Sequence, residues 1–479
     1  MFISPQGEAL HKSVGYQEIP KFVQLGQDAM DENKQFYALK AKYDAGDKTP
    51  SVLYNYAMAM YGSDAYYQSG EVADEYLKQL DKKGLKSKQT MDMVMDIPVI
   101  HDGFAAQLLL DKRKKYVKAY TAEKVDNKLL GMMKSKVNKA AKEKNANGLK
   151  EATAFLSENA PAKAAKWNNK LEISFYQKTE NWDAYATAAT KFVENYMMDD
   201  SEALNNFAWT FFETMEDNKE LQKAVKWADR SIELEKNYYN TDTKAALLHK
   251  IGKHEEALAA AKVAIDAAIE EQMEPKETRE LVTKITYDSG LGLDYIMTNR
   301  EAFAQSLGDK QTAKTMKKLM HNAAYRAGKD KNADDLQSVI ALVKKHYPKK
   351  AATTSTSLTL TYYESANNWD EYVNTATTYI EDEGGMDDWN MLNTVAWGFF
   401  ENIEDKDLLK KALVWANRSV ELDKNYYNTD TQAALNYKLG NNQDALTAAK
   451  IALELAAKEG IEAKETEELM KKLVKTLEP

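Results

Sequence analysis

Apolar residues recur at helical spacing along most of the chain. In the stretches 129–156 and 312–343 they lie three and four positions apart, with polar residues between them. This period places the apolar residues on one face of a helix, and that face has to pack against a neighbour. The stretch 53–77 also predicts a helical hairpin. We therefore expect antiparallel helix pairs over most of the sequence.

Small residues mark the contacts expected between these helices. Ala224, Ala228 and Ser231 are followed 33 residues later by Ala257, Ala261 and Ala264. Small residues at this spacing share one helix face, where a neighbouring helix can approach closely. The second half of the chain repeats the pattern at Ala412, Ala416, Ser419, Ala445, Ala449 and Ala452.

The sequence contains a clear internal duplication. Residues 230–247 read RSIELEKNYYNTDTKAAL and residues 418–435 read RSVELDKNYYNTDTQAAL, identical at 15 of 18 positions with an offset of 188. The tryptophan pairs Trp209/Trp397, Trp227/Trp415 and Trp182/Trp369 extend the match, and a weaker match pairs Phe104 with Phe303. We therefore divide the chain into residues 1–32, divergent hairpins at 33–89, and two repeat modules at 90–286 and 287–479.

The last hairpin of the first module resembles the tetratricopeptide repeat (TPR), whose period is about 34 residues. Gly252, Ala257, Ala261 and Ala264 stand where that family has its turn glycine and small packing residues. The preceding hairpin departs from the family, with Lys236 where proline is usual. The expected fold class is all-α, an α-solenoid of TPR-like hairpins in two duplicated modules.

The first 30 residues have a different pattern. MFISPQGEALHKSVG predicts a β-hairpin, and YQEIPKFVQLGQDAM predicts an amphipathic helix. With Gly7 and Gly15 eight residues apart, this segment resembles the last two strands and last helix of a thioredoxin fold. The resemblance implies a catalytic domain upstream of Met1, so that Met1 is not the natural start. It also implies a periplasmic or envelope location, as in Bacteroidetes-type bacteria. Without an upstream signal peptide, the expected location is cytoplasmic.

Composition and charge narrow the possible functions. The absence of cysteine excludes disulfides, thiolate metal sites and thiol catalysis within this chain. The formal net charge is −9. Basic bands at 112–150 and 310–350 carry net charges of +10 and +8, and acidic bands at 194–220 and 381–407 carry −7 and −8. The bands are interpreted as solvated helix faces that complement each other, or as docking surfaces for an anionic partner; nucleic-acid motifs do not accompany them.

The repeated KNYYNTDT octapeptide has two interpretations. It forms a ligand-binding loop, or it forms a turn and cap between hairpins, with Asn237 and Asn240 in the turn and Thr241 or Asp242 as the cap. The second interpretation is favoured. The recurring aromatic residues are likewise expected mainly in the core, with a minority exposed.

Other candidate chemistry is sparse. Only His249 and His254 are close in sequence among the six histidines, and a spacing of five across a glycine turn does not favour a metal site. Phosphate-binding loops, nucleophile elbows and zinc-protease motifs do not occur. The sequence predicts no catalytic, cofactor-binding or metal-binding residues, and it does not identify a binding residue.

The predicted function is a non-catalytic helical-repeat scaffold that binds a protein or peptide partner. The alternative is the C-terminal arm of a thioredoxin-like thiol-disulfide oxidoreductase. Cofactors and a membrane span are not expected, and nucleic acid or another polyanion is the less favoured partner.

Overall fold

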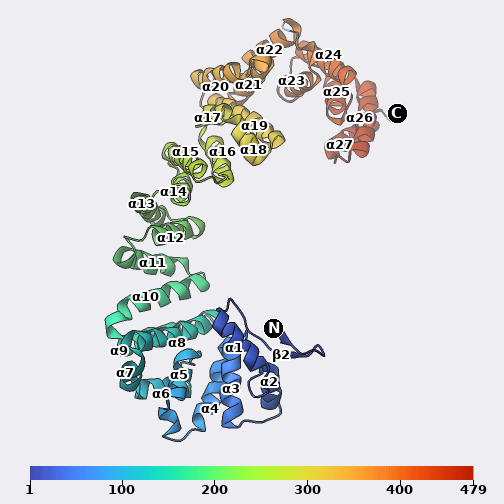
Figure 1. The fold of residues 1–479 in the computed structure, drawn as a ribbon. Helices are drawn as coiled ribbons and strands as arrows, with labels where there is room; N and C mark the ends of the chain where they lie inside the picture. The colour runs from blue at the N-terminus through green and yellow to red at the C-terminus, as the bar shows by residue number, and fades with distance from the viewer. Residues whose placement is uncertain (383, 478–479) are drawn as a thin grey trace. The chain divides into compact units, whose positions relative to one another are not determined.

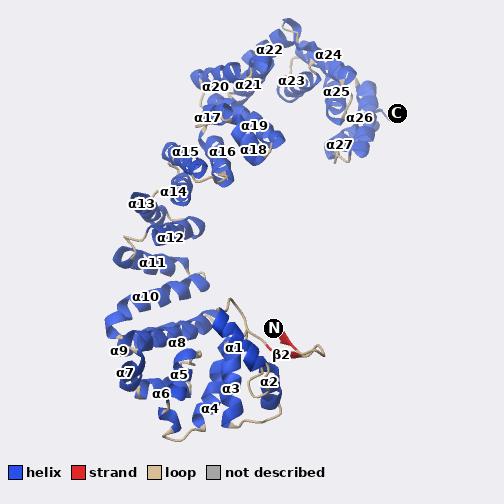
Figure 2. Cartoon of the chain, viewed as in Figure 1, coloured by secondary structure: helices blue, strands red, loops and turns tan. Residues whose placement is uncertain are grey.

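The computed structural model describes residues 1–382 and 384–477, and these residues form an all-α fold with one small β-hairpin (Figures 1 and 2). The predicted fold class is confirmed: successive helices pack as antiparallel hairpins in sequence order. The chain divides into two compact units, Met1–Glu235 (unit 1) and Lys236–Pro479 (unit 2). Among the described residues, no helix is both long enough and apolar enough to cross a membrane.

Unit 1 contains the β-hairpin and the first thirteen α-helices of the described chain. Its elements are β1 (Phe2–Ile3), β2 (Ala9–His11), α1 (Ile19–Ala29), α2 (Phe36–Asp44), α3 (Pro50–Tyr61), η1 (Tyr66–Gln68), α4 (Ser69–Lys78), η2 (Gly84–Lys86), α5 (Lys88–Asp96), α6 (Phe104–Asp111), α7 (Arg113–Tyr120), α8 (Ala122–Lys142), α9 (Ala146–Asn159), α10 (Pro161–Lys178), α11 (Trp182–Tyr196), α12 (Ser201–Thr214) and α13 (Asn218–Leu234).

All the secondary-structure elements in the described residues of unit 2 are helices. Its elements are α14 (Tyr238–Lys250), α15 (His254–Glu270), α16 (Lys276–Ser289), α17 (Leu293–Thr298), α18 (Arg300–Leu307), α19 (Asp309–Lys329), α20 (Ala333–His346), η3 (Pro348–Lys350), α21 (Ala351–Ser365), α22 (Trp369–Thr377), the π-helical turn η4 (Thr378–Asp382), η5 (Gly385–Asp387), α23 (Trp389–Asn402), α24 (Lys406–Leu422), α25 (Tyr426–Leu439), α26 (Asn442–Glu459) and α27 (Lys464–Leu477).

The small residues lie at the helix contacts, as predicted. All of them are fully buried: Ala224, Ala228, Ser231, Ala257, Ala261, Ala264, Ala412, Ala416, Ser419, Ala445, Ala449 and Ala452. Large aromatic rings fill the adjacent space. Trp227 meets Phe211 edge to face at 4.8 Å between ring centroids, and Trp415 meets Phe399 at 5.2 Å. The same packing therefore holds the α12/α13 hairpin of unit 1 and the α23/α24 hairpin of unit 2.

Helix starts and turns follow local sequence signals. Asn181 and Asn368 cap α11 and α22, because their side chains accept hydrogen bonds from the backbone N–H groups of Ala184 and Glu371. Gly252 closes the turn after α14 with a φ of +81°, a conformation that glycine adopts without strain. These features confirm the predicted caps and the turn glycine.

The N-terminal segment folds as a β-hairpin followed by a helix, as expected. β1 pairs with β2 in antiparallel register, and the Phe2 ring lies 5.8 Å from the Phe22 ring of α1. The apolar face of α1 is largely exposed at Ile19, Phe22, Val23 and Met30. The elements are thus confirmed, whereas the resemblance to a thioredoxin fold stays a prediction.

The helix bounds correct one detail of the duplication. The helices α8 and α19 are both 21 residues long, and α9 and α20 are both 14 residues long. In this register the eight-residue helices α7 and α18 also correspond, so Phe303 matches the buried Tyr116 rather than Phe104. The sequence match of Phe104 with Phe303 was misleading because both residues stand near the start of an eight-residue helix and are followed by alanine.

Candidate functional site

Both copies of the KNYYNTDT octapeptide lie in unit 2, and each begins a helix, α14 or α25. Asn237 caps α14: its side chain accepts a hydrogen bond from the Asn240 backbone N–H at 3.1 Å, and the Asn240 side chain accepts one from the Asn237 N–H at 3.0 Å. Asn425 and Asn428 form the same capping box at α25. The capping interpretation is confirmed, but Thr241 and Asp242 are not the cap. The helix starts earlier because the reciprocal asparagine pair already satisfies its first N–H groups.

Asp242 instead belongs to a polar network between α14 and α16. Its carboxylate accepts a hydrogen bond of 2.5 Å from the Thr278 hydroxyl, which lies 3.3 Å from the Tyr238 hydroxyl. Burial, with Glu277 nearby, raises the pKa of the Asp242 carboxyl above its ordinary value. Asp430, Thr466 and Tyr426 repeat the network, and burial raises the pKa of Asp430 as well. The network is internal to the packing, so it has a structural role.

The second tyrosine of the octapeptide points away from this network. Tyr239 and Tyr427 are each 58% exposed, at the same position of the first turn of α14 and α25. The preceding tyrosine in each copy, Tyr238 or Tyr426, is buried and belongs to the network. Each copy of the motif therefore exposes one aromatic ring to solvent, and that ring stands on the first turn of a capped helix, α14 or α25.

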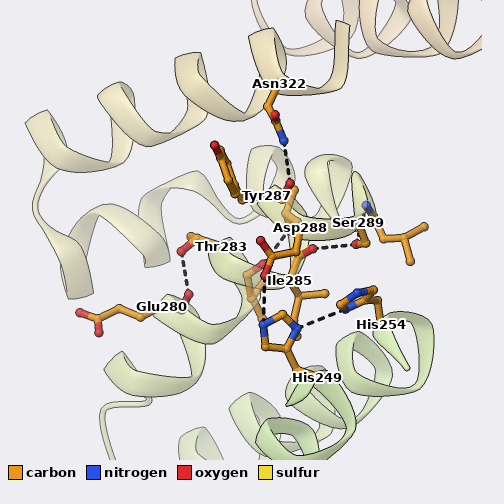
Figure 3. Close-up of polar contacts among 12 residues, drawn as sticks. His249, His254, Glu280, Thr283, Ile285, Tyr287, Asp288, Ser289 and Asn322 are labelled. Carbon is orange, nitrogen blue, oxygen red and sulfur yellow. Dashed lines mark hydrogen bonds and ion pairs between the residues drawn. The ribbon is translucent and has the colours of Figure 1, made fainter. Parts of the chain in front are cut away.

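His249 and His254 meet across the turn between α14 and α15 (Figure 3). Their Nδ1 atoms are 3.2 Å apart, so one ring donates a hydrogen bond to the other, and the Nε2 atom of His249 lies 3.3 Å from the Asp288 carboxylate. Burial lowers the pKa of His249, and Lys284 and His254 act in the same direction, whereas Asp288 opposes them. Within residues 1–382 and 384–477, no three acidic or histidine side chains are arranged to hold a metal ion.

A hollow of about 820 Å³ opens among α18, α19, α21 and α23 of unit 2. Its apolar surface comes mainly from Met316, Met320 and Met391, all buried. Hydroxyl groups also line it, from Tyr347, Thr353, Thr354, Ser357 and Thr394. A volume of this size is in the range of pockets that bind small ligands or several side chains of a partner.

The charge of the hollow is predominantly positive. Arg300, Lys317 and Lys350 contribute cationic groups, and Asp388 contributes the one carboxylate among the lining residues. Asp388 is engaged as the cap of α23, where it accepts a hydrogen bond from the Met391 N–H at 3.0 Å. Burial lowers the pKa of His321, another lining residue, whose Nδ1 atom lies 3.1 Å from the Thr361 hydroxyl. The hollow is thus suited to a ligand with an anionic group and an apolar part.

The sequence analysis did not identify this hollow. Lys317 and Lys350 belong to the basic band 310–350 and Arg300 precedes it, but nothing in the sequence distinguishes these three residues from other surface bases. The acidic bands pair with bases outside the basic bands: Asp199 with Arg230 at 3.2 Å, Asp387 with Arg418 at 3.1 Å and Glu381 with Lys411 at 3.0 Å. The acids that pair with the basic bands, such as Asp126 with Arg113, Glu151 with Lys136 and Asp294 with Lys345, lie outside the acidic bands.

Comparison with known proteins gives low similarity. No family model matches the sequence, and no curated protein matches it. Among solved structures, the TPR domain of P58(IPK) is 15% identical and aligns over 89% of this chain and 96% of its own, with a TM-score of 0.24. The Naa15/Naa10 complex bound to HypK-THB contains a chain that is 12% identical, aligned over 95% of this chain and 85% of its own, with a TM-score of 0.23.

Proposed function

We propose that this chain is a non-catalytic scaffold that binds other proteins through its helical hairpins. The observation that carries the proposal is the pair of equivalent exposed rings, Tyr239 and Tyr427. Tyrosine is enriched at protein interfaces, because its ring buries a large area at low entropic cost and its hydroxyl group still bonds water or a partner. Each ring stands on a helix start fixed by an asparagine capping box, so little freedom is lost on binding.

The test compares partners of the unmodified chain of residues 1–479 with those of a double variant, Tyr239→Ser with Tyr427→Ser. Affinity-tagged chains are purified from cells of the natural source, and bound proteins are quantified by mass spectrometry. The control is Tyr67→Ser, because Tyr67 is another highly exposed tyrosine outside the repeated motif. A protein retained by the parent and the control, but bound about tenfold more weakly by the double variant, is the expected result. If the same proteins bind equally to all three chains, the proposal is wrong.

The thioredoxin-arm alternative rests on one observation, the exposed apolar face of α1 at Ile19, Phe22, Val23 and Met30. A thioredoxin-type sheet packed on this face would bury it. Reading the genomic frame immediately upstream of the Met1 codon tests the alternative. An open frame that encodes a Cys-x-x-Cys motif supports it, and a stop codon directly before Met1 contradicts it.

A further inference from the structure

The duplicated modules allow the hollow in unit 2 to be compared with the equivalent place in unit 1. The helices α8 and α19 have the same length and begin 187 positions apart, at residues 122 and 309. The same offset matches Arg113 with Arg300, at the first positions of α7 and α18, and Lys163 with Lys350. Two cations of the hollow therefore have exact counterparts of the same residue type in unit 1.

In unit 1 these cations have a partner from within the chain. The carboxylate of Asp126, on α8, lies 2.6 Å from Arg113 and 3.4 Å from Lys163. Next to it the indole ring of Trp167, on α10, is buried in the core of the unit, with the Lys163 ammonium 5.3 Å from the ring centroid. Unit 1 thus fills this place with one carboxylate and one aromatic ring of its own.

Unit 2 lacks both of these side chains. Ala313 stands at the position of Asp126, and Thr354 stands at the position of Trp167; both line the hollow. Arg300 turns to the exposed Asp309, at 2.7 Å. Within the described part of the chain, no carboxylate lies at ion-pair distance from Lys350 or Lys317. The loss of the acid and the ring leaves a positively charged hollow with buried methionines.

We propose that the hollow among α18, α19, α21 and α23 binds an aromatic carboxylate, which supplies from outside the groups that Asp126 and Trp167 supply in unit 1. The carboxylate pairs with Lys350 and Arg300, and a charge-assisted contact of this kind is among the stronger hydrogen bonds in proteins. The aromatic ring lies against Met316 and Met320, because methionine sulfur packs favourably against aromatic rings and adapts to their shape. The Lys350 ammonium also faces the ring, as Lys163 faces Trp167.

The aromatic carboxylate has two possible sources, a small aromatic acid or an acidic side chain beside an aromatic one in a peptide. Both offer the same chemistry to the hollow. The inference does not depend on the scaffold function, because a small acid can bind whether or not a protein binds at Tyr239 and Tyr427. The two are tested by different variants, so either can fail alone.

The experiment titrates the full chain with indole-3-acetate by calorimetry and by ligand-observed NMR. For a ligand of this size the expected Kd is about 1 mM or tighter, with one site per chain. Indole-3-acetamide has the same ring without the charge and is expected to bind at least about tenfold more weakly. The peptide arm uses N-acetyl-Trp-Asp-amide. Tighter binding of this dipeptide than of indole-3-acetate assigns a peptide source, and weaker binding assigns a small acid.

Three variants exchange side chains between equivalent positions of the two modules. Ala313→Asp with Thr354→Trp closes the hollow with the residues that unit 1 uses, so the fold is retained and binding is lost. Ala313→Asp alone neutralises the cations without filling the space and weakens binding at least about tenfold. The reverse change, Asp126→Ala with Trp167→Thr, opens the equivalent place in unit 1 and raises the stoichiometry from one to two. Circular dichroism melts show which variants remain folded.

Several results would overturn the proposal. The native chain is titrated with each probe up to about 10 mM, and the absence of saturable binding by both probes in this range refutes the site. Unchanged binding by the folded Ala313→Asp/Thr354→Trp variant places the ligand elsewhere. Equal binding of the acid and the amide removes the carboxylate from the inference.

Discussion

The Thr278 hydroxyl donates a hydrogen bond of 2.5 Å to the Asp242 carboxylate, and Thr466 repeats this contact with Asp430 at 2.6 Å. In both copies the bond connects the helix that begins in the octapeptide to the second helix after it. In the first copy it connects α14 to α16, and in the second copy α25 to α27. The acid is kept in a place where burial raises its pKa. A single hydroxyl group is therefore the main compensation for a carboxylate taken out of water.

Replacing Asp242 with Asn is expected to flatten part of the pH dependence of stability. Because the folded pKa is raised, the unfolded chain loses this proton first as the pH rises, so the group reduces stability above the unfolded pKa of 3.8. The amide cannot ionise, and its oxygen still accepts the Thr278 bond. Urea unfolding at about pH 7 should show a gain of about 1 kcal/mol relative to the parent, with less gain near about pH 4. Equal shifts at both pH values would contradict the buried-charge explanation. Thr278→Val is the matched control, since it removes the bond and should destabilise at both.

Introducing tryptophan at Ala261 or Ala449 should overpack the helix contacts. Both alanines are fully buried at hairpin crossings, so an indole ring has no space without moving a helix. The expected loss is about 1–3 kcal/mol in the free energy of unfolding, measured by urea denaturation. Ala259→Trp, at an exposed position of the same helix as Ala261, is the control and should leave stability nearly unchanged. If all three variants unfold like the parent, the assigned packing face is wrong.

Thr121 and Gly308 should respond in opposite ways to substitution. Both precede the long helix of their module with a positive φ, +108° for Thr121 and +87° for Gly308. A β-branched residue is strained in this region, whereas glycine is not. Thr121→Gly should therefore raise the melting temperature, with a gain of about 1 kcal/mol after the loss of the weak 3.3 Å cap to Lys124. Gly308→Thr should lower it by a similar amount or more. Destabilisation by both changes would show that the cap outweighs the strain.

The histidine pair should make the chain less stable in mild acid. Burial lowers the folded pKa of His249, so the unfolded chain binds the proton more readily once the pH falls below 6.5. The groups that face this ring are His254, Asp288 and Lys284, and only Asp288 favours the charged form. The fall in melting temperature between about pH 7.5 and about pH 5.5 should be smaller in His249→Gln than in the parent, by roughly 2–4 °C. His346→Gln, at a different histidine, serves as the control; an equal effect from it would exclude a specific role for His249.

The helical hairpins could be predicted because their signals are local. Alanines such as Ala224 and Ala228 lie on one helix face whatever the rest of the chain does, and a cap such as Asn181 acts within three residues. The start of α14 was misplaced because Asn237, Asn240, Thr241 and Asp242 are all competent capping residues. The reciprocal hydrogen bonds that select Asn237 are visible only in three dimensions.

The hollow could not be predicted because it depends on side chains that are small rather than on a motif. Ala313 and Thr354 carry no signal by themselves. They become informative only beside Asp126 and Trp167, and that comparison needs the register fixed by α8 and α19. The sequence match of Phe104 with Phe303 gave a different register at this point. The helix lengths corrected it.

The near-identity of residues 230–247 and 418–435 has a consequence for how the chain reaches its native state. The helices α15 and α26 present the same alanine faces, at Ala257, Ala261 and Ala264 and at Ala445, Ala449 and Ala452. Each packs against the motif helix of its own copy, α15 on α14 and α26 on α25. The short connection at Gly252 favours the correct pairing, because it gives α15 a far higher effective concentration than any distant helix. The contact between His249 and His254 favours the same pairing, since α26 has Asn442 at the position of His254. The short loop therefore helps to prevent exchange between the copies, and lengthening this turn would expose the chain to swapped, misassembled forms.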